Sequence, residues 1–162
     1  MALLTEAAVT VAVSQLGVRE QGGNNRGPDV DLYLASVGLD EGSSWCAVFV
    51  YWCFRRASNM LIVTNPCPRT GGALKLWKLA DAQFHAVTPT RGRVFVMDHG
   101  MGLGHVGFVE AVRGDGSIDT IAGNTNAEGS RNGDRVGRHT FDPTDGSHGK
   151  LVGYLDFDAT SA

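Results

Sequence analysis

A net positive charge is absent from this chain of 162 residues, which carries 14 Lys and Arg residues against 17 Asp and Glu residues. The formal net charge of −3 and the isoelectric point of about 5.9 exclude the electrostatic signature of a nucleic-acid-binding protein and a polybasic membrane patch. Arginines do cluster at Arg55 and Arg56 and over residues 131–138, and we interpret both clusters as solvated surface. No run of 18 apolar residues occurs, so no membrane span is predicted.

No signal peptide is predicted at the start of the sequence either. Residues 1–17 are apolar, but no basic stretch precedes them, and Glu6 and Gln15 interrupt them, unlike the apolar region of a secretory leader. The apolar residues recur at helical spacing and predict an amphipathic first helix; they are Leu4, Ala8, Val11, Ala12 and Leu16. We therefore expect the protein to be synthesised in the cytoplasm without a signal peptide.

Internal repeats, low-complexity segments and an interdomain linker are missing as well. Because 162 residues is close to the length of one typical domain, we expect a single domain over residues 1–162 with its core at about 5–157. A chain of this length buries roughly 70% of its unfolded surface and can form a core without disulfides.

Cysteine is scarce, since the sequence contains Cys46, Cys53 and Cys67 alone. Their number is odd and no Cys-x-x-Cys pair occurs, so the sequence predicts neither a disulfide framework nor a structural zinc site. An odd thiol in such a chain is a candidate nucleophile. We expect Cys53 to be a buried, inert thiol inside a helix. Cys67 follows a proline and precedes another, and it could alternatively pair with Cys53.

Glycine, by contrast, is abundant, with 22 residues, about twice the usual share of ~7%. Without a collagen period, these glycines indicate turns and close backbone approaches, and they argue against an all-helical bundle. Beyond the first helix, apolar spacing and capping residues predict helices over residues 29–37, 45–57 and 71–80. Apolar runs between turn residues predict strands over residues 93–97, 104–112, 117–122, 135–140 and 151–157. Helices followed by an antiparallel sheet are typical of an α+β domain.

Cys46 has the position that thiol chemistry favours. Ser43 and Ser44 are candidate N-caps for the helix over residues 45–57, which places Cys46 in the first turn. The helix dipole lowers the pKa of a thiol there, and the backbone N–H of Cys46 could serve as one donor of an oxyanion hole. The alternative is that Cys46 is a small core residue, as free cysteines often are.

A cysteine nucleophile requires a base, for which histidine is the usual choice. Of the five histidines, His105 begins an apolar strand, whereas the other four fall in polar or loop segments; those four are His85, His99, His139 and His148. A third group should orient the imidazole. Asn124 ends the neighbouring strand, and the hairpin through Asp115 brings Asn124 and His105 to the same end of the sheet. Asn124 could alternatively be a simple turn residue.

Four segments, in order, resemble those of CHAP domains (cysteine, histidine-dependent amidohydrolases/peptidases). Residues 44–52 (SWCAVFVYW) resemble the nucleophile helix, residues 104–109 (GHVGFV) the histidine strand, and residues 121–125 (IAGNT) the strand of the third residue. Residues 89–96 (PTRGRVFV) resemble the preceding strand, where the family often has Asp at the position of Arg93. This family is part of the papain-like superfamily that includes NlpC-type cell-wall peptidases, and the resemblance covers roughly residues 5–157.

The resemblance implies a papain-like α+β fold in which the nucleophile helix packs on an antiparallel sheet. It also implies hydrolysis of amide bonds in peptidoglycan, either at the N-acetylmuramoyl-L-alanine bond or within the stem peptide or cross-bridge. Cys46 then corresponds to the nucleophile, His105 to the general base and Asn124 to the orienting group. Many family members carry Glu two residues before the Asn, and Ala122 takes that position here. Asn124 would therefore act alone, or Asp98 or Glu110 would assist it.

The resemblance also suggests residues for substrate binding. Related cell-wall peptidases use a Tyr about a dozen residues before the cysteine as an oxyanion donor, and Tyr33 is the candidate here; the alternative is that it packs into the core. Trp45, with Trp52 and Trp77, could form an aromatic wall for a glycan, although one or two of them could instead belong to the core. Some CHAP domains bind Ca²⁺ before the cysteine, but the acidic residues here do not match that spacing, so we expect no metal and no cofactor; these residues are Asp29, Asp31, Asp40 and Glu41.

The leading hypothesis is thus a peptidoglycan hydrolase, with peptidoglycan as its partner, acting as a monomer on the cell wall after release or delivery. The absent signal peptide suits a phage endolysin released by a holin, or a secreted effector that would be paired with an immunity protein. Two alternatives remain open. One is a catalytically inactive papain-like module that binds peptide or glycan, which Ala122 favours. The other is a cytoplasmic thiol amidohydrolase acting on a small amide or isopeptide.

Overall fold

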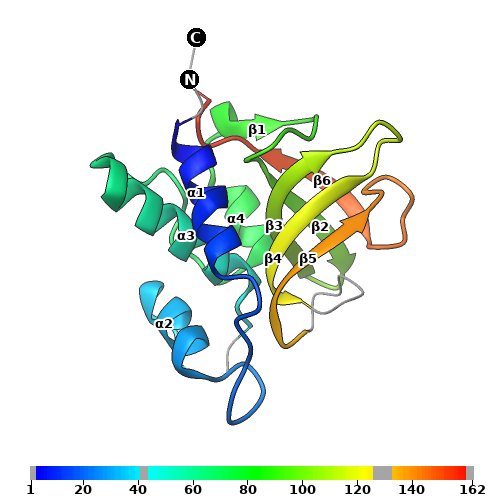
Figure 1. Cartoon of the computed structure of the whole chain (residues 1–162). Helices are drawn as coiled ribbons and strands as arrows, with labels where there is room; N and C mark the ends of the chain where they lie inside the picture. The colour runs from blue at the N-terminus through cyan, green and yellow to red at the C-terminus, as the bar shows by residue number, and fades with distance from the viewer. Residues whose placement is uncertain (1–2, 41–43, 126–132, 160–162) are drawn as a thin grey trace.

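The computed structural model describes residues 3–40, 44–125 and 133–159 and confirms the predicted α+β class (Figure 1). The first half of the chain is helical, with α1 (Leu3–Ser14), α2 (Pro28–Ser36), α3 (Cys46–Leu61) and α4 (Ala73–Leu79). A short 3₁₀ helix, Ala82–Phe84, leads into the strands. These are β1 (His85–Ala86), β2 (Val94–Gly100), β3 (Leu103–Val112), β4 (Ile118–Thr125), β5 (Arg135–Phe141) and β6 (Lys150–Leu155).

The strands form one antiparallel sheet in the order β1-β6-β2-β3-β4-β5. Figure 1 shows α1, α3 and α4 on the same side of this sheet, while α2 packs on α3 farther away. The larger apolar cluster fills the space between the helices and the sheet, with α3 at its centre. A second cluster covers the opposite face of the strands. Among the described residues, no helix is long and apolar enough to cross a membrane.

Helix α3 differs from its prediction at both ends. Its N-cap is Trp45, which makes no side-chain capping bond, so Ser44 is not the cap; Ser43 lies outside the described residues. The helix also continues to Leu61 instead of ending at residue 57. It stops where Ile62 adopts a left-handed backbone with φ of 57°, because this conformation terminates helices.

Smaller differences have similar local causes. The N-cap of α4 is Gly72 rather than Thr70, whose hydroxyl instead accepts the backbone N–H of Gly72 at 3.2 Å. Strand β1 was not predicted, because two residues are too few to show an alternating pattern. It forms by pairing with the end of β6. The hairpin that joins β3 to β4 lies at Gly114–Gly116, as expected.

Gly123 in β4 lies tightly against the start of α3. A Cβ atom at this position would lie 2.7 Å from Cβ of Phe49 and 2.9 Å from Cζ3 of Trp45, both of which are fully buried. Overpacking of this kind costs about 1–3 kcal/mol, so we expect Gly123→Ala to lower the free energy of unfolding by that amount in urea denaturation.

Gly114 is the matched control for this substitution, because no atom lies within 4 Å of the Cβ that it would gain. We expect Gly114→Ala to change the free energy of unfolding by less than about 0.5 kcal/mol. Equal destabilisation by the two substitutions would contradict the close approach of β4 to α3.

Candidate active site

Cys46 is the first residue of α3, the position that the sequence predicted for a reactive thiol. Its side chain is 4% exposed and is a thiol rather than half of a disulfide. The backbone N–H groups of the first helical turn have no carbonyl partner within the helix and carry the positive end of its dipole. The helix end therefore favours a thiolate, and its N–H groups can stabilise an oxyanion beside the sulfur atom.

The other two cysteines have different surroundings. Cys53 and Cys67 are buried, and both are thiols, so the alternative disulfide between them is not formed. Burial raises the pKa of each thiol, and the neighbouring Cys67 further raises the pKa of Cys53. A buried thiol with a raised pKa stays protonated and unreactive, which agrees with the expectation of an inert Cys53.

His105 and Asn124 lie at the same end of the sheet, on neighbouring strands. Phe108 of β3 pairs with Ile121 of β4, and continuing this register toward the strand ends places His105 level with Asn124. On its other side, His105 pairs with Met97 of β2. Both His105 and Asn124 are almost fully buried. The hairpin therefore aligns the two residues as the sequence predicted.

A hydrogen bond ties Asn124 to the chain just before the nucleophile helix. Nδ2 of Asn124 donates to Oγ of Ser44 at 3.0 Å, and Ser44 lies two residues before Cys46. Asn124 has a φ of 53°, a left-handed backbone that Asn tolerates better than most residues. This bond, with the contact of Gly123 against Trp45, connects β4 directly to the start of α3.

Ser44 is thus a site residue that the sequence interpretation treated only as a helix cap. Its partner lies 80 residues away along the chain, and no local pattern predicts such a contact. The sequence offered one signal for a role of Ser44 in the site, which is that it lies two residues before Cys46.

Tyr33 does not present its hydroxyl to Cys46. The side chain is buried, and its hydroxyl donates to Oε1 of Gln15 at 2.6 Å. Its ring packs on the rings of Trp45, Phe49 and Trp52, and burial raises the pKa of the phenol. Because a hydroxyl has one proton, Tyr33 could donate to an oxyanion only after leaving Gln15.

The tryptophans do not form a common wall. Trp45 is fully buried and its indole N–H donates to Oε1 of Glu20 at 2.9 Å, so it has no ring surface for a glycan. Trp77 stacks on His85 with ring centroids 3.7 Å apart. Trp52 lies one heptad beyond Trp45, packs on Tyr33 as well, and has the guanidinium of Arg56 over its ring. Trp45 thus belongs to the core, which is the alternative that the sequence left open for one or two of the tryptophans.

Neither carboxylate proposed to assist Asn124 contacts it. Glu110 accepts two hydrogen bonds from Arg138, at 2.7 and 2.8 Å, and lies five residues beyond His105 on β3, about 16 Å away in an extended strand. Asp98 is nearer, since it pairs with Gly104. Its carboxylate, however, accepts the backbone N–H of Gly100 at 2.7 Å. Of Asn124, Asp98 and Glu110, Asn124 is therefore the residue that bonds to the segment just before Cys46.

Acidic and histidine side chains do not gather into a metal centre in the described part of the chain, where no three of His, Cys, Asp or Glu are arranged to hold an ion. Asp29 and Asp31 lie in the first turn of α2. Glu41, the last of the acidic residues considered for Ca²⁺, lies outside the described residues.

The comparison with protein families gives a match. The family model of the CHAP domain matches residues 38–124, which is more than half of the chain. The matched span begins shortly before α3 and ends at Asn124, so it includes Cys46 and His105 as well. No curated protein matches the sequence.

Proposed function

Because the chain belongs to the CHAP domain family, which is typically a family of cysteine, histidine-dependent amidohydrolases and peptidases, we propose that it hydrolyses amide bonds in peptidoglycan with Cys46 as the nucleophile. The observation that carries the proposal is the arrangement around α3. Cys46 begins this helix, Ser44 ties the same segment to Asn124, and Asn124 lies level with His105.

The proposed reaction is acyl transfer through a thioester. The thiolate of Cys46 attacks the carbonyl carbon of the amide, and the resulting oxyanion accepts a hydrogen bond from the backbone N–H of Cys46. The imidazolium of His105 gives its proton to the leaving amine, and the C–N bond breaks. His105 then takes a proton from water as the water attacks the thioester, and the C–S bond breaks, which releases the acid and restores the thiolate of Cys46 and the imidazolium of His105.

Asn124 orients the imidazole in this proposal without adding a charge. An amide has one oxygen that accepts hydrogen bonds and one NH₂ group that donates them. Because the NH₂ group of Asn124 donates to Ser44, the amide oxygen is left as the acceptor for an N–H of His105. Ser44 therefore determines which end of the amide the imidazole meets, and we propose it as a positioning residue.

We expect Ser44→Ala to lower kcat/KM for wall hydrolysis about 3- to 10-fold, the equivalent of one lost hydrogen bond. A poorly held amide stabilises the imidazolium less, so the pKa of His105 should fall and the alkaline limb of the pH profile should move to lower pH. The measurement is kcat/KM against pH for wild type, Ser44→Ala and Ser44→Thr, which keeps the hydroxyl and should restore activity.

Ser58 of α3 is a matched control, because within the described residues its buried hydroxyl has no hydrogen-bond partner. Ser58→Ala should therefore leave both kcat/KM and the pH profile unchanged. If Ser44→Ala behaved like Ser58→Ala, Ser44 would have no positioning role.

Purified cell walls separate the proposed function from the two alternatives. A hydrolase lowers the turbidity of a wall suspension, whereas an inactive binding module would sediment with walls and leave the turbidity constant. An amidohydrolase for small amides would do neither. Constant turbidity with folded wild-type protein on walls of several peptide types would therefore overturn the proposal.

A further inference from the structure

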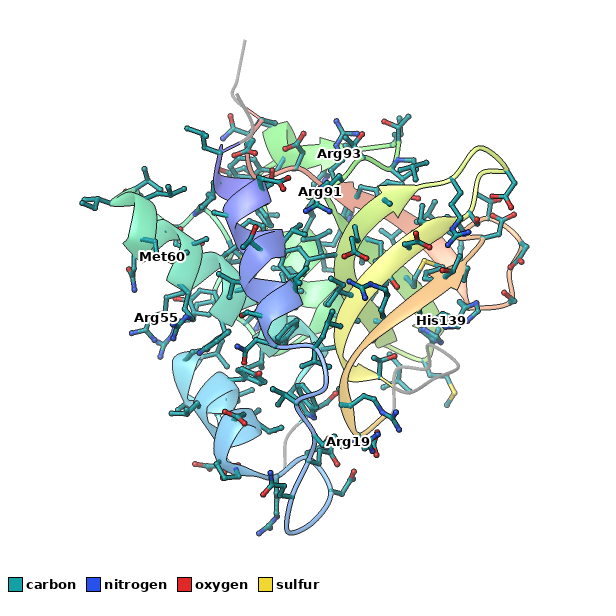
Figure 2. The ribbon with its side chains drawn as sticks, in the orientation of Figure 1. Arg19, Arg55, Met60, Arg91, Arg93 and His139 are labelled. Carbon is teal, nitrogen blue, oxygen red and sulfur yellow. The ribbon has the colours of Figure 1, made fainter. Side chains whose placement is uncertain are left out.

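A hollow of about 390 Å³ lies between α2 and α3, at the part of the molecule farthest from the sheet. Helix α3 lines it with residues at positions i, i+3, i+4 and i+7, which share one face of a helix: Trp52, Arg55, Arg56 and Asn59. Helix α2 supplies the facing wall through Leu32, Ala35 and Ser36. Figure 2 shows Arg55 on this outer side of the molecule, near α2.

In the part of the chain that the structure describes, no carboxylate balances the charge in this hollow. None of its described lining residues is acidic, and the sequence of α3 contains no Asp or Glu. Within the described residues, neither Arg55 nor Arg56 forms an ion pair. The usual arrangement in this protein is different, because other arginines pair with a carboxylate; these are Arg19, Arg91, Arg93, Arg113, Arg135 and Arg138. Two adjacent unpaired cations therefore meet in one concave site of a chain with a net charge of −3.

Trp52 lines the hollow with an aromatic ring that neighbouring side chains hold in place. The guanidinium carbon of Arg56 lies 4.9 Å from the centroid of the Trp52 ring, within the range of a cation–π contact. The ring itself is held by its edge-on contact with buried Tyr33, with centroids 4.8 Å apart. Because stacking uses the face of the guanidinium, its N–H edge stays available for the bidentate hydrogen bonds that carboxylate and phosphate groups accept.

We propose that this hollow is an anion-binding site that takes a carboxylate or phosphate group, with Arg55 and Arg56 on the oxyanion and the aliphatic side of the ligand against Leu32 and Ala35. The site is separate from the thiol, since Arg55 lies nine residues beyond Cys46 on α3, about 14 Å along the helix axis. The proposal does not depend on the proposed hydrolysis, and it gives a ligand to two arginines that are exposed to solvent, as the sequence predicted.

The test uses nuclear magnetic resonance of the ¹⁵N-labelled full chain, in which the indole N–H of Trp52 reports on the hollow. Sodium propionate and sodium phosphate are titrated separately, at ionic strength held constant with sodium chloride. We expect at least one of them to shift the Trp52 signal saturably, while the indole signals of Trp45 and Trp77 stay in place. Saturation by propionate identifies a carboxylate ligand, and saturation by phosphate identifies a phosphate ligand.

The double substitution Arg55→Gln with Arg56→Gln should weaken binding about tenfold or more, because each charged hydrogen bond contributes more than a neutral one. Substitution of both arginines by Lys keeps the charge but removes the paired N–H groups of the guanidinium. This variant should bind with intermediate affinity. Both residues are exposed, so the fold should persist, which the unchanged Trp45 and Trp77 signals check. A Trp52 shift that does not saturate, or equal affinity of the wild type and the Gln variant, would overturn the proposal.

Discussion

Cys46→Ala is expected to abolish the loss of turbidity in a suspension of purified cell walls, with a rate about 10⁴-fold or more below that of the wild type. Removal of the nucleophile from a catalytic triad has an effect of this size, because the covalent pathway disappears and only binding and oxyanion stabilisation remain. Cys46 is buried in the core to the same extent as Cys67, but its side chain is small, so Ala leaves only a small cavity. The variant should therefore fold normally.

Cys67→Ala is the control for this experiment. Cys67 is buried, and burial raises the pKa of its thiol, so it should not act as a nucleophile. Its replacement should keep the rate of turbidity loss near that of the wild type, although a small cavity is expected to lower the melting temperature. Lysis by Cys46→Ala at the wild-type rate would remove Cys46 from the mechanism.

His105→Ala is expected to slow the alkylation of Cys46 by at least about tenfold at pH 6.5. An adjacent imidazolium stabilises the thiolate and therefore lowers the pKa of the thiol. Without His105, the pKa of Cys46 should rise toward the ordinary value of about 8.5, and the thiolate fraction below that pH should fall. The measurement is the rate of iodoacetamide labelling at each cysteine between about pH 5.5 and pH 9, read by peptide mass spectrometry.

The two buried cysteines are internal controls in the same labelling experiment. Because burial raises the pKa values of Cys53 and Cys67, their thiols stay protonated over this pH range and should be labelled only when the protein is unfolded. If Cys46 of the wild type were labelled with the pH dependence of an ordinary thiol, this result would contradict a Cys46–His105 ion pair.

The fold class and the alignment of the candidate site could be predicted from the sequence because they depend on local patterns. Apolar spacing identified the helices, and the turn at Gly114–Gly116 identified the hairpin that places His105 level with Asn124. The likeness to CHAP domains added the roles of these residues, which the spacing alone does not contain.

The contacts around the site could not be predicted, since they join segments that are distant in the chain. The N-cap of α3 is Trp45 instead of a serine, and Trp45 is buried and bonded to Glu20. Tyr33 satisfies its hydroxyl with Gln15 on the segment after α1. Ser44 bonds to Asn124 across 80 residues. Each of these long-range contacts outweighs a preference that local sequence patterns express and that holds in most proteins.

The most direct test of the central proposal is mass spectrometry of the fragments released from purified peptidoglycan. The account predicts new amino termini with wild-type protein and none with Cys46→Ala. A new terminus on L-Ala indicates cleavage of the N-acetylmuramoyl-L-alanine bond, and any other new terminus indicates an endopeptidase. Intact peptidoglycan after treatment with wild type, or new amino termini in equal amounts with both proteins, would contradict amide hydrolysis by Cys46.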